Sequence, residues 1–213
     1  GEGAVNASVE EELEAQGIEV IRVAGDSRDK AAAEIAKIIV DDGTVEQVVL
    51  VNGYNFPDAV SVAAYAAQEG LPILLTQDAK LPQATQAALY DLKASETLVI
   101  GGTGAIAENV AKQVPNATRI AGADRFATSV EIAKHFDYDT KEYYVTTGMD
   151  FPDALAAGAI AAKDNTGVLL VGKYVHNYHK AFITDNNVDI ITVVGGTSVV
   201  SDDILSEFKR LVD

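Results

Sequence analysis

The chain has 213 residues, with 32 acidic and 16 basic side chains, a formal net charge of −16 and no cysteine. Its 48% apolar residues are enough for a buried core, which excludes an intrinsically disordered chain, and the missing cysteines exclude a disulfide scaffold and a cysteine–zinc site. The acidic balance argues against a nucleic-acid partner, and no apolar run reaches the roughly 18 residues of a membrane-spanning helix. We therefore expect no nucleic-acid partner and no membrane partner.

The first residues resemble the end of a repeat whose beginning is missing. Gly1–Val5 aligns with Gly102–Ile106, so we expect residues 1–17 to be the tail of a truncated preceding repeat and the chain to be a fragment of a larger protein. A helix is predicted at Ser8–Gln16, with Gly17 ending it. Its apolar side chains should pack on the first full repeat or on another chain. These are Val5, Val9 and Leu13.

Strands and helices alternate after this tail. Apolar runs predict strands at Ile18–Val23, Val48–Val51, Leu71–Thr76 and Leu98–Ile100. Helical spacing of apolar residues predicts helices at Arg28–Val40, Pro57–Gln68, Gln83–Leu92 and Glu108–Val114. The second half of the chain repeats the pattern, with strands at Tyr143–Thr146, Val168–Val171 and Ile190–Val194. Continuous apolar strands that alternate with helices are typical of an α/β fold, in which helices cover both faces of a parallel sheet.

The sequence also repeats in detail, at an offset of about 95 residues. In chain order the matches are Ile21–Arg28 with Thr118–Arg125, Glu34–Lys37 with Glu131–Lys134, Phe56–Ala59 with Phe151–Ala154, Leu74–Leu75 with Leu169–Leu170, and Gly101–Thr103 with Gly195–Thr197. Ordered matches at a nearly constant offset indicate a duplication, and the period is too long for one solenoid unit. We therefore predict two small tandem α/β domains, at 18–117 and 118–213.

These motifs carry a resemblance to a known family. The order Arg-x-x-Gly-x-x-Arg, Phe-Pro-Asp-Ala, Leu-Leu and Gly-Gly-Thr resembles the type 2 cell-wall-binding repeat of Gram-positive bacteria, over essentially the whole chain. The resemblance implies α/β repeats that hold surface proteins, such as S-layer components and wall hydrolases, noncovalently on the cell wall. It also implies an anionic secondary wall polymer of the teichoic-acid kind as the ligand. The first repeat departs from the family pattern at Asp26-Ser27, where the second has Ala123-Asp124.

Two Phe-Pro-Asp turns supply the first candidate residues. Asn55 and Asp150 precede these turns and can accept hydrogen bonds from free helix amides, while Asp58 and Asp153 favour the positive end of a helix. This interpretation makes them helix starts. Because ligands of α/β proteins bind at the carboxyl ends of the strands, the same four residues are also candidate contacts to a polymer or an ion.

Arg28 and Arg125 occupy equivalent positions near the start of a predicted helix, where a cation opposes the helix dipole. One interpretation is a structural pair with Asp58 or Asp153 on the neighbouring helix. The other is a contact with the polymer, since a guanidinium fork binds phosphate or carboxylate through two hydrogen bonds.

The Gly-Gly-Thr turns complete the candidate polymer-binding set: Gly101, Gly102, Thr103, Gly195, Gly196 and Thr197. The segment Gly102–Ala107 also fits the G-x-G-x-x-G/A dinucleotide fingerprint between a strand and a helix, with Asp124 near the expected spacing downstream. The second repeat weakens this alternative, because Ser198 and Ser201 replace Gly104 and Ala107. Close packing of the turn against a neighbour is the competing explanation.

The remaining motifs point to neither a metal nor catalysis. His176 and His179 lie three residues apart without an evident third ligand, so we expect a solvated surface there rather than zinc. Asp137-Tyr138-Asp139 begins like a calcium loop, but Glu142 and Gly148 stand where an EF-hand needs Gly and Glu. With three histidines and no cysteine, nucleophilic catalysis has few groups to use. We expect neither a cofactor nor an enzyme.

The sequence thus predicts an extracellular, noncovalent cell-wall anchor that binds an anionic wall polymer. Its other expected partners are neighbouring repeats of the same protein or a second copy of the chain. Two alternatives stay open. One is a nucleotide-binding or enzymatic α/β domain that uses the Gly102–Ala107 loop, and the other is a structural surface-layer module whose repeats bind each other.

Overall fold

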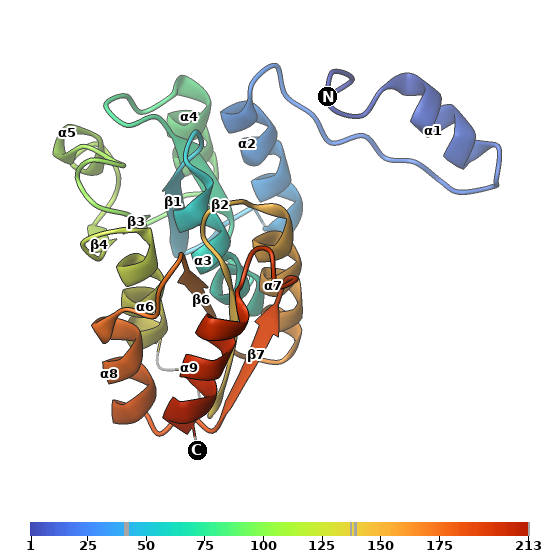
Figure 1. Ribbon diagram of the computed structural model, residues 1–213. Helices are drawn as coiled ribbons and strands as arrows, with labels where there is room; N and C mark the ends of the chain where they lie inside the picture. Colours follow the sequence, from blue (N-terminus) through green and yellow to red (C-terminus); the bar gives the residue numbers. More distant parts are fainter. Residues whose placement is uncertain (41–42, 137, 139, 213) are drawn as a thin grey trace.

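The computed structural model describes residues 1–40, 43–136, 138 and 140–212 (Figure 1). Its helices are α1 (Ala7–Glu14), α2 (Arg28–Ile39), α3 (Phe56–Gln68), α4 (Gln83–Asp91), α5 (Glu108–Ala111), α6 (Arg125–Phe136), α7 (Pro152–Lys163), α8 (Asn177–Asp185) and α9 (Asp202–Val212). Its strands are β1 (Gln47–Asn52), β2 (Ile73–Thr76), β3 (Glu96–Ile100), β4 (Ala117–Ile120), β5 (Glu142–Thr147), β6 (Val168–Val171) and β7 (Ile190–Val194).

The strands form two parallel sheets, in the orders β2-β1-β3-β4 and β6-β5-β7. Parallel neighbours need a crossover connection, which is why a helix follows nearly every strand. Tandem parallel-sheet units of the α/β class are therefore confirmed. The strand β1 pairs with β2 and β3, and β5 pairs with β6 and β7, so a three-stranded order recurs in both sheets. The first sheet has β4 as an additional fourth strand.

Alternation along the buried strands gives each sheet two apolar faces. In β1, Val48 and Leu50 belong to a core that includes side chains of α2 and α4, whereas Val49 and Val51 belong to a core that includes side chains of α3. The second sheet repeats this: one face packs with α6, α8 and α9, and the other with α7 and α3. Because both faces are covered, the strands read as unbroken apolar runs in the sequence.

The strand β4 connects the two units. Its residues open the second sequence repeat, yet they pair with β3 of the first sheet, from Thr97 beside Ala117 to Ile100 beside Ile120. The last strand of the first sheet is thus supplied by the chain that leads into the second repeat.

The two repeats share a continuous core through α3. Val60 and Ala64 of α3 pack with Ala154 and Ala157 of α7, and the ring of Tyr65 stacks on Phe136 of α6 with ring centroids 3.3 Å apart. Small alanine side chains allow this close helix approach, which explains the alanine-rich sequence and the low aromatic content. The repeats are therefore packed together as one unit rather than joined by a free linker.

The alanine substitution of Gly158 tests this interface. A Cβ at Gly158 would lie 3.7 Å from the Cβ of Ala63 and 3.8 Å from the Val60 carbonyl oxygen, both ordinary contacts. Since glycine inside a helix is less stable than alanine, Gly158→Ala should raise the free energy of unfolding by about 1 kcal/mol in urea denaturation. Gly158→Leu should lower it, because the larger side chain separates α3 from α7; equal stability of both variants would contradict the packing.

The predicted strand at Ile18–Val23 is wrong. The structure assigns no strand there, and Ile21 is 77% exposed. A strand needs a neighbour for its backbone hydrogen bonds, and this segment lies beside neither sheet.

The tail helix is confirmed as α1, and Gly17 adopts the left-handed φ of 81° expected after a helix end. In Figure 1, α1 lies to one side of the sheets. Its apolar residues line a shallow hollow with residues 20–23 and stay exposed, so they do not pack on the sheet layers of the first repeat; packing on another chain stays a prediction. These are Val5, Val9 and Leu13.

Candidate functional site

The candidate residues gather where β1 and β5 end and the following loops begin. At the end of β1, Arg28 donates from Nη1 to the carbonyl oxygen of Gly53, and its guanidinium carbon lies 4.3 Å from the centre of the Tyr54 ring. The start of α2 therefore supplies the arginine and the β1–α3 loop holds it. A guanidinium has five N–H donors, so donation to one carbonyl leaves donors for a further acceptor.

Arg125 has the same placement in the second repeat. It lies at the start of α6 and donates from Nη1 to the carbonyl oxygen of Gly148 at 2.9 Å. Neither arginine forms the predicted contact with Asp58 or Asp153, because among the described residues neither has a carboxylate oxygen within 4.0 Å. The charge of Arg125 nevertheless acts on Asp58 from a longer distance. The cation at the helix start is instead stabilised by a backbone carbonyl at the end of a strand.

Asp58 is buried, with 5% of its surface exposed. A Cβ at Gly101 would overlap its Oδ2, so the carboxylate lies directly under the first Gly-Gly turn. Burial raises the pKa of Asp58 to about 6, and the positive charge of Arg125, from the other repeat, opposes that rise. Asp58 thus links the Gly-Gly turn of its own repeat to the arginine of the next.

Asp153 repeats the contact with its own turn. Its Oδ2 lies 3.0 Å from the position of a Cβ at Gly195, and both Gly101 and Gly195 have positive φ, 108° and 128°. The Phe-Pro-Asp and Gly-Gly-Thr motifs are therefore two halves of one structural contact. The sequence analysis considered these two motifs separately. The fact that both motifs recur together in each repeat could have indicated that they are in contact.

The helix-start interpretation of the Phe-Pro-Asp turns is correct, with a difference in capping. Asp150 accepts a hydrogen bond from the Phe151 amide at 2.8 Å. Asn55 is the N-cap residue of α3, but its side chain makes no capping hydrogen bond. Pro57 lies at the first turn of α3 as expected, because proline has no amide hydrogen to leave unbonded there.

Asn52 organises the first loop and was missed by sequence reasoning. Its Nδ2 donates to the Ala105 carbonyl at 2.6 Å and its Oδ1 accepts from the Tyr54 amide at 2.8 Å. It thereby holds the backbone of Tyr54, the residue whose ring Arg28 stacks on. An open hollow of about 540 Å³ lies beside it, lined by Asn52, Tyr54, Asn55, Gln77, Asp78, Gly104 and Ala105.

The equivalent positions of the second repeat differ from this set. Thr147, Met149 and Asp150 replace Asn52, Tyr54 and Asn55. The stacked tyrosine and the amide side chains are thus particular to the first repeat, whereas the arginine on a backbone carbonyl is common to both.

The Gly102–Ala107 loop does not have the form of a dinucleotide site. The amides of Ala105 and Ile106 donate to the Gly102 carbonyl, and the amide of Ala107 donates to the backbone carbonyl of Asp78 at 2.7 Å. The following helix α5 has four residues. Three amides of this loop are thus already bonded within the protein and the helix that follows is short, which argues against the nucleotide alternative.

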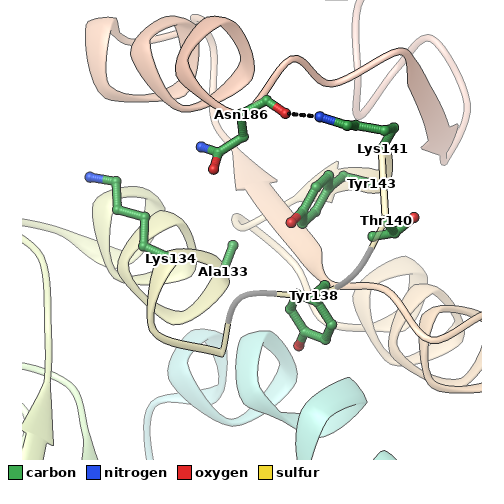
Figure 2. A pocket seen from close by; sticks show the side chains of 7 residues that line it. All are labelled: Ala133, Lys134, Tyr138, Thr140, Lys141, Tyr143 and Asn186. Atoms are coloured by element: carbon green, nitrogen blue, oxygen red, sulfur yellow. Dashed lines mark hydrogen bonds between the residues drawn. The ribbon is translucent and has the colours of Figure 1, made fainter.

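A second hollow, of about 560 Å³, lies beside the amino end of β5, away from all the predicted site residues. Figure 2 shows its lining, with Lys141 donating to the Asn186 carbonyl at 2.8 Å and Tyr138 near Tyr143, with ring centroids 6.1 Å apart. Burial raises the pKa of the Tyr138 hydroxyl above its ordinary range.

The structure corrects the expectation that His176 and His179 lie on a solvated surface. We expected a solvated pair, but His179 is completely buried, with its Nδ1 accepting from the His176 amide at 3.1 Å and its Nε2 3.0 Å from the Leu170 carbonyl. Burial lowers the pKa of His179 to about 4, so the ring is neutral at pH 7 and its Nε2 donates to that carbonyl.

Three further observations bear on metals and membranes. Asp137 and Asp139 lie outside the described residues. Within the described part of the chain, no three histidine, aspartate or glutamate side chains are grouped as a metal ion would require. None of the helices described there is both long and apolar enough to cross a bilayer.

The duplicated α/β fold, with one arginine-bearing loop edge in each repeat, defines a repeat-built binding module. The family model of cell wall binding domain 2 (CWB2) matches residues 22–111 and 119–205, and the chain belongs to this family. The family occurs in surface proteins of Gram-positive bacteria, which places the chain outside the cell, at the wall or cell surface.

Relatives and solved structures agree with this assignment. Over its full length the chain is 32% identical to the N-acetylmuramoyl-L-alanine amidase LytC of Bacillus subtilis (strain 168), and it covers 42% of that protein. Over 208 residues it is 29% identical to the amidase enhancer of the same strain, of which it covers 28%. Cwp6 from Clostridium difficile matches 91% of the chain at a TM-score of 0.81 and 28% identity. Cwp8 from Clostridium difficile matches 96% of the chain at a TM-score of 0.81 and 25% identity. The chain covers 33% of Cwp6 and 36% of Cwp8, so it spans less than half of each relative.

Proposed function

We propose that this chain anchors a larger surface protein noncovalently to the cell wall by binding an anionic secondary wall polymer through Arg28 and Arg125. The observation that carries the proposal is the way both arginines are held. Each donates to a strand-end carbonyl, and among the described residues neither has a carboxylate oxygen within 4.0 Å, in a chain that has twice as many acidic as basic side chains. An arginine placed in this way keeps its positive charge available to an anion.

Net charge decides what kind of binding is possible. At −16 the mean field of the protein repels an anionic polymer, so long-range attraction is absent and binding depends on short-range contacts. Guanidinium forks supply such contacts with phosphate or carboxylate. Moderate salt should therefore aid binding by screening the repulsion, until the contacts themselves weaken.

The other candidates have secondary roles in this proposal. Asp58 is too buried to touch a polymer and acts through the turn it supports. Asn55 and Asp150 lie at the loop edge, where a bridging cation is the competing route; we favour the arginines because Asn55 lacks the charge that two matching cation sites would require. Each arginine site is weak alone, so affinity comes from several repeats that bind together.

Wall binding of arginine variants tests the proposal. Loss of a charge-assisted hydrogen bond weakens binding by about 1.5–3 kcal/mol, so Arg28→Ala and Arg125→Ala should each reduce affinity for purified walls about tenfold or more, and the double variant further. Cosedimentation with walls, before and after chemical removal of the secondary polymers, measures this with and without chelator.

Two controls make the result specific. Arg210→Ala removes the same charge from an exposed position at the end of α9 and should bind as the parent does. Arg28→Lys keeps the charge but not the fork and should bind less well than the parent. If the folded double variant binds like the parent while chelator abolishes binding, the arginine route is wrong and the cation route replaces it.

We also propose that the chain itself has no catalytic activity. The family match spans both repeats and describes a binding module, and the chain covers less than half of the amidase that it resembles. Reproducible release of reducing sugars or amino groups from walls by this chain would contradict the proposal.

A further inference from the structure

Asp58 is a buried carboxylate without a direct counter-charge. It has 5% of its surface exposed, and among the described residues no lysine, arginine or histidine nitrogen lies within 4.0 Å of its oxygens. Burial raises its pKa and one more distant charge opposes the rise, with no hydrogen bond from the described residues contributing. Because burial without a partner destabilises the charged form, Asp58 takes up a proton more readily than an exposed carboxylate does.

Asp58 also lies where the two repeats meet. It belongs to the first turn of α3, and α3 packs on α6 and α7 of the second repeat. Its Oδ2 faces the Gly-Gly turn of its own repeat, since a Cβ at Gly101 would overlap it. The positive charge that acts on it is Arg125, at the start of α6. A carboxylate of one repeat is therefore coupled to the arginine of the next.

The other titratable groups around α3 do not take the place of Arg125. On α3 itself the further titratable side chain is Tyr65, later in the helix. The elements packed on α3 carry Arg125, Glu131, Lys134 and His135 on α6, with Asp124 directly before it, Asp153 and Lys163 on α7, and Glu96 on β3, while β1, β2 and β6 carry none. Beside the Gly-Gly turn, Arg119 pairs with Glu108 and donates to the Gly101 carbonyl. Among these described groups, Arg125 is the one whose charge acts on Asp58.

We propose that a proton on Asp58 strengthens the hold of Arg125 on an anionic group of the wall polymer, so that the second repeat binds more tightly in mildly acid than in neutral conditions. Asp58 is a positioning residue in this proposal: it acts through Arg125 and does not touch the polymer. The inference rests on the proposed function, because it takes Arg125 as the contact to the anion.

Electrostatics gives the direction of the effect. When Asp58 is ionised, its negative charge repels an anion that approaches Arg125. When Asp58 is protonated, this repulsion is absent and the full positive charge of Arg125 acts on the anion. Because the carboxylate is buried, salt and water screen the repulsion less than they would between two surface charges. The anion therefore binds more tightly to the protonated form.

The pH range of the effect follows from the protonation of Asp58. Burial raises its pKa to about 6 in the free protein. By linkage, an anion bound at Arg125 raises this pKa further, so binding takes up a proton and affinity is lost as the pH rises through about 6 and above. From Coulomb's law for two charges several ångströms apart near a protein surface, we expect the affinity at Arg125 to fall about three- to tenfold.

An NMR titration of the Asp58 carboxyl tests the coupling without any ligand. In protein with isotope-labelled aspartate, the Asp58 signal is the one that Asp58→Asn lacks. Arg125→Ala should raise the pKa of Asp58, because it removes the positive charge that favours the ionised carboxylate. Arg28→Ala removes the equivalent arginine of the first repeat and should leave this pKa unchanged. An Asp58 pKa that is the same in the parent and in Arg125→Ala would overturn the proposal.

Cosedimentation with purified walls between about pH 5 and pH 7.5 tests the consequence for binding. Relative to Asp58→Asn, whose side chain stays neutral, the parent should lose about three- to tenfold in affinity as the pH rises. Comparison of the two proteins at equal pH cancels any titration of the polymer itself. Asp153→Asn removes the equivalent carboxylate of the second repeat and should keep the profile of the parent. Arg28→Ala should keep this pH dependence, whereas Arg125→Ala should lose it.

The outcomes separate this inference from the proposed function. If Arg125→Ala binds less well than the parent, but the affinity ratio between the parent and Asp58→Asn is constant over the pH range, the inference alone is wrong. If Arg125→Ala binds walls like the parent, the proposed function is wrong at this residue and the inference fails with it.

Discussion

Gly101→Ala should destabilise the protein strongly, although the substitution adds a single methyl group. At a φ of 108° an L-residue is strained by roughly 1–3 kcal/mol. The new Cβ would also overlap Oδ2 of the buried Asp58, and forcing extra volume into a packed site adds about 1–3 kcal/mol. We therefore expect the free energy of unfolding in urea to fall by about 2–6 kcal/mol, a large part of the stability of an ordinary domain.

The neighbouring glycine supplies the matched control. A Cβ at Gly102 would meet nothing within 4 Å, so Gly102→Ala should leave stability almost unchanged. Gly195→Ala should destabilise less than Gly101→Ala, because its Cβ would lie 2.8 Å from Val199 Cγ2 and 3.0 Å from Asp153 Oδ2, whereas a Cβ at Gly101 would come closer still to Asp58 Oδ2. If Gly101→Ala and Gly102→Ala were equally stable, the contact between the Gly-Gly turn and Asp58 would have no structural role.

Asp58→Asn should make the protein more stable at neutral pH. The folded state raises the pKa of Asp58 from 3.8 to about 6, so the folded protein holds this proton more tightly than the unfolded chain does. The contribution of the Asp58 proton to the free energy of unfolding is therefore fully present below pH 4. It is lost as the pH rises through the folded-state pKa of about 6, because the buried carboxyl then ionises. Asparagine stays neutral throughout, and the shift corresponds to a gain of about 3 kcal/mol for the variant above pH 7.

The pH profile separates this effect from a general change in packing. The difference in unfolding free energy between Asp58→Asn and the parent should shrink toward pH 4 and level off above about pH 7. Asp153→Asn is the control, because its half-buried carboxyl occupies the equivalent position in the second repeat. A difference for Asp58→Asn that stays constant between pH 4 and 8 would contradict the raised pKa.

Both predictions concern a contact that supports the proposed binding edge rather than a residue that binds. Asp58 lies under the Gly-Gly turn of its own repeat and near Arg125 of the other. A change at Asp58 can therefore alter wall binding through the position of Arg125. For that reason the arginine variants, and not Asp58 variants, are the direct test of polymer binding.

Some of the candidate site could be predicted from sequence, and some could not. The equivalence of Arg28 and Arg125 and their place at helix starts follow from the repeat, because equal sequences in equal folds occupy equal positions. Their partners do not follow. An arginine can donate hydrogen bonds to either a carboxylate or a backbone carbonyl. Arg28 and Arg125 donate to the carbonyls of Gly53 and Gly148 because the tertiary fold brings these strand ends next to the helix starts. The burial of His179 likewise depends on tertiary packing, because this residue of α8 contacts the Leu170 carbonyl of β6 and lies beside Phe208 of α9.

The sequence by itself determined the α/β class, the duplication and most of the strands, because apolar runs of strand length and helical periodicity are local properties of the chain. Tertiary structure decided which of two similar segments became a strand. Residues 117–120 form β4 beside β3, whereas residues 20–23, with the same motif, form none. A β-strand is stabilised by hydrogen bonds to a neighbour that local sequence does not specify, so the same motif is a strand only where a sheet edge is beside it.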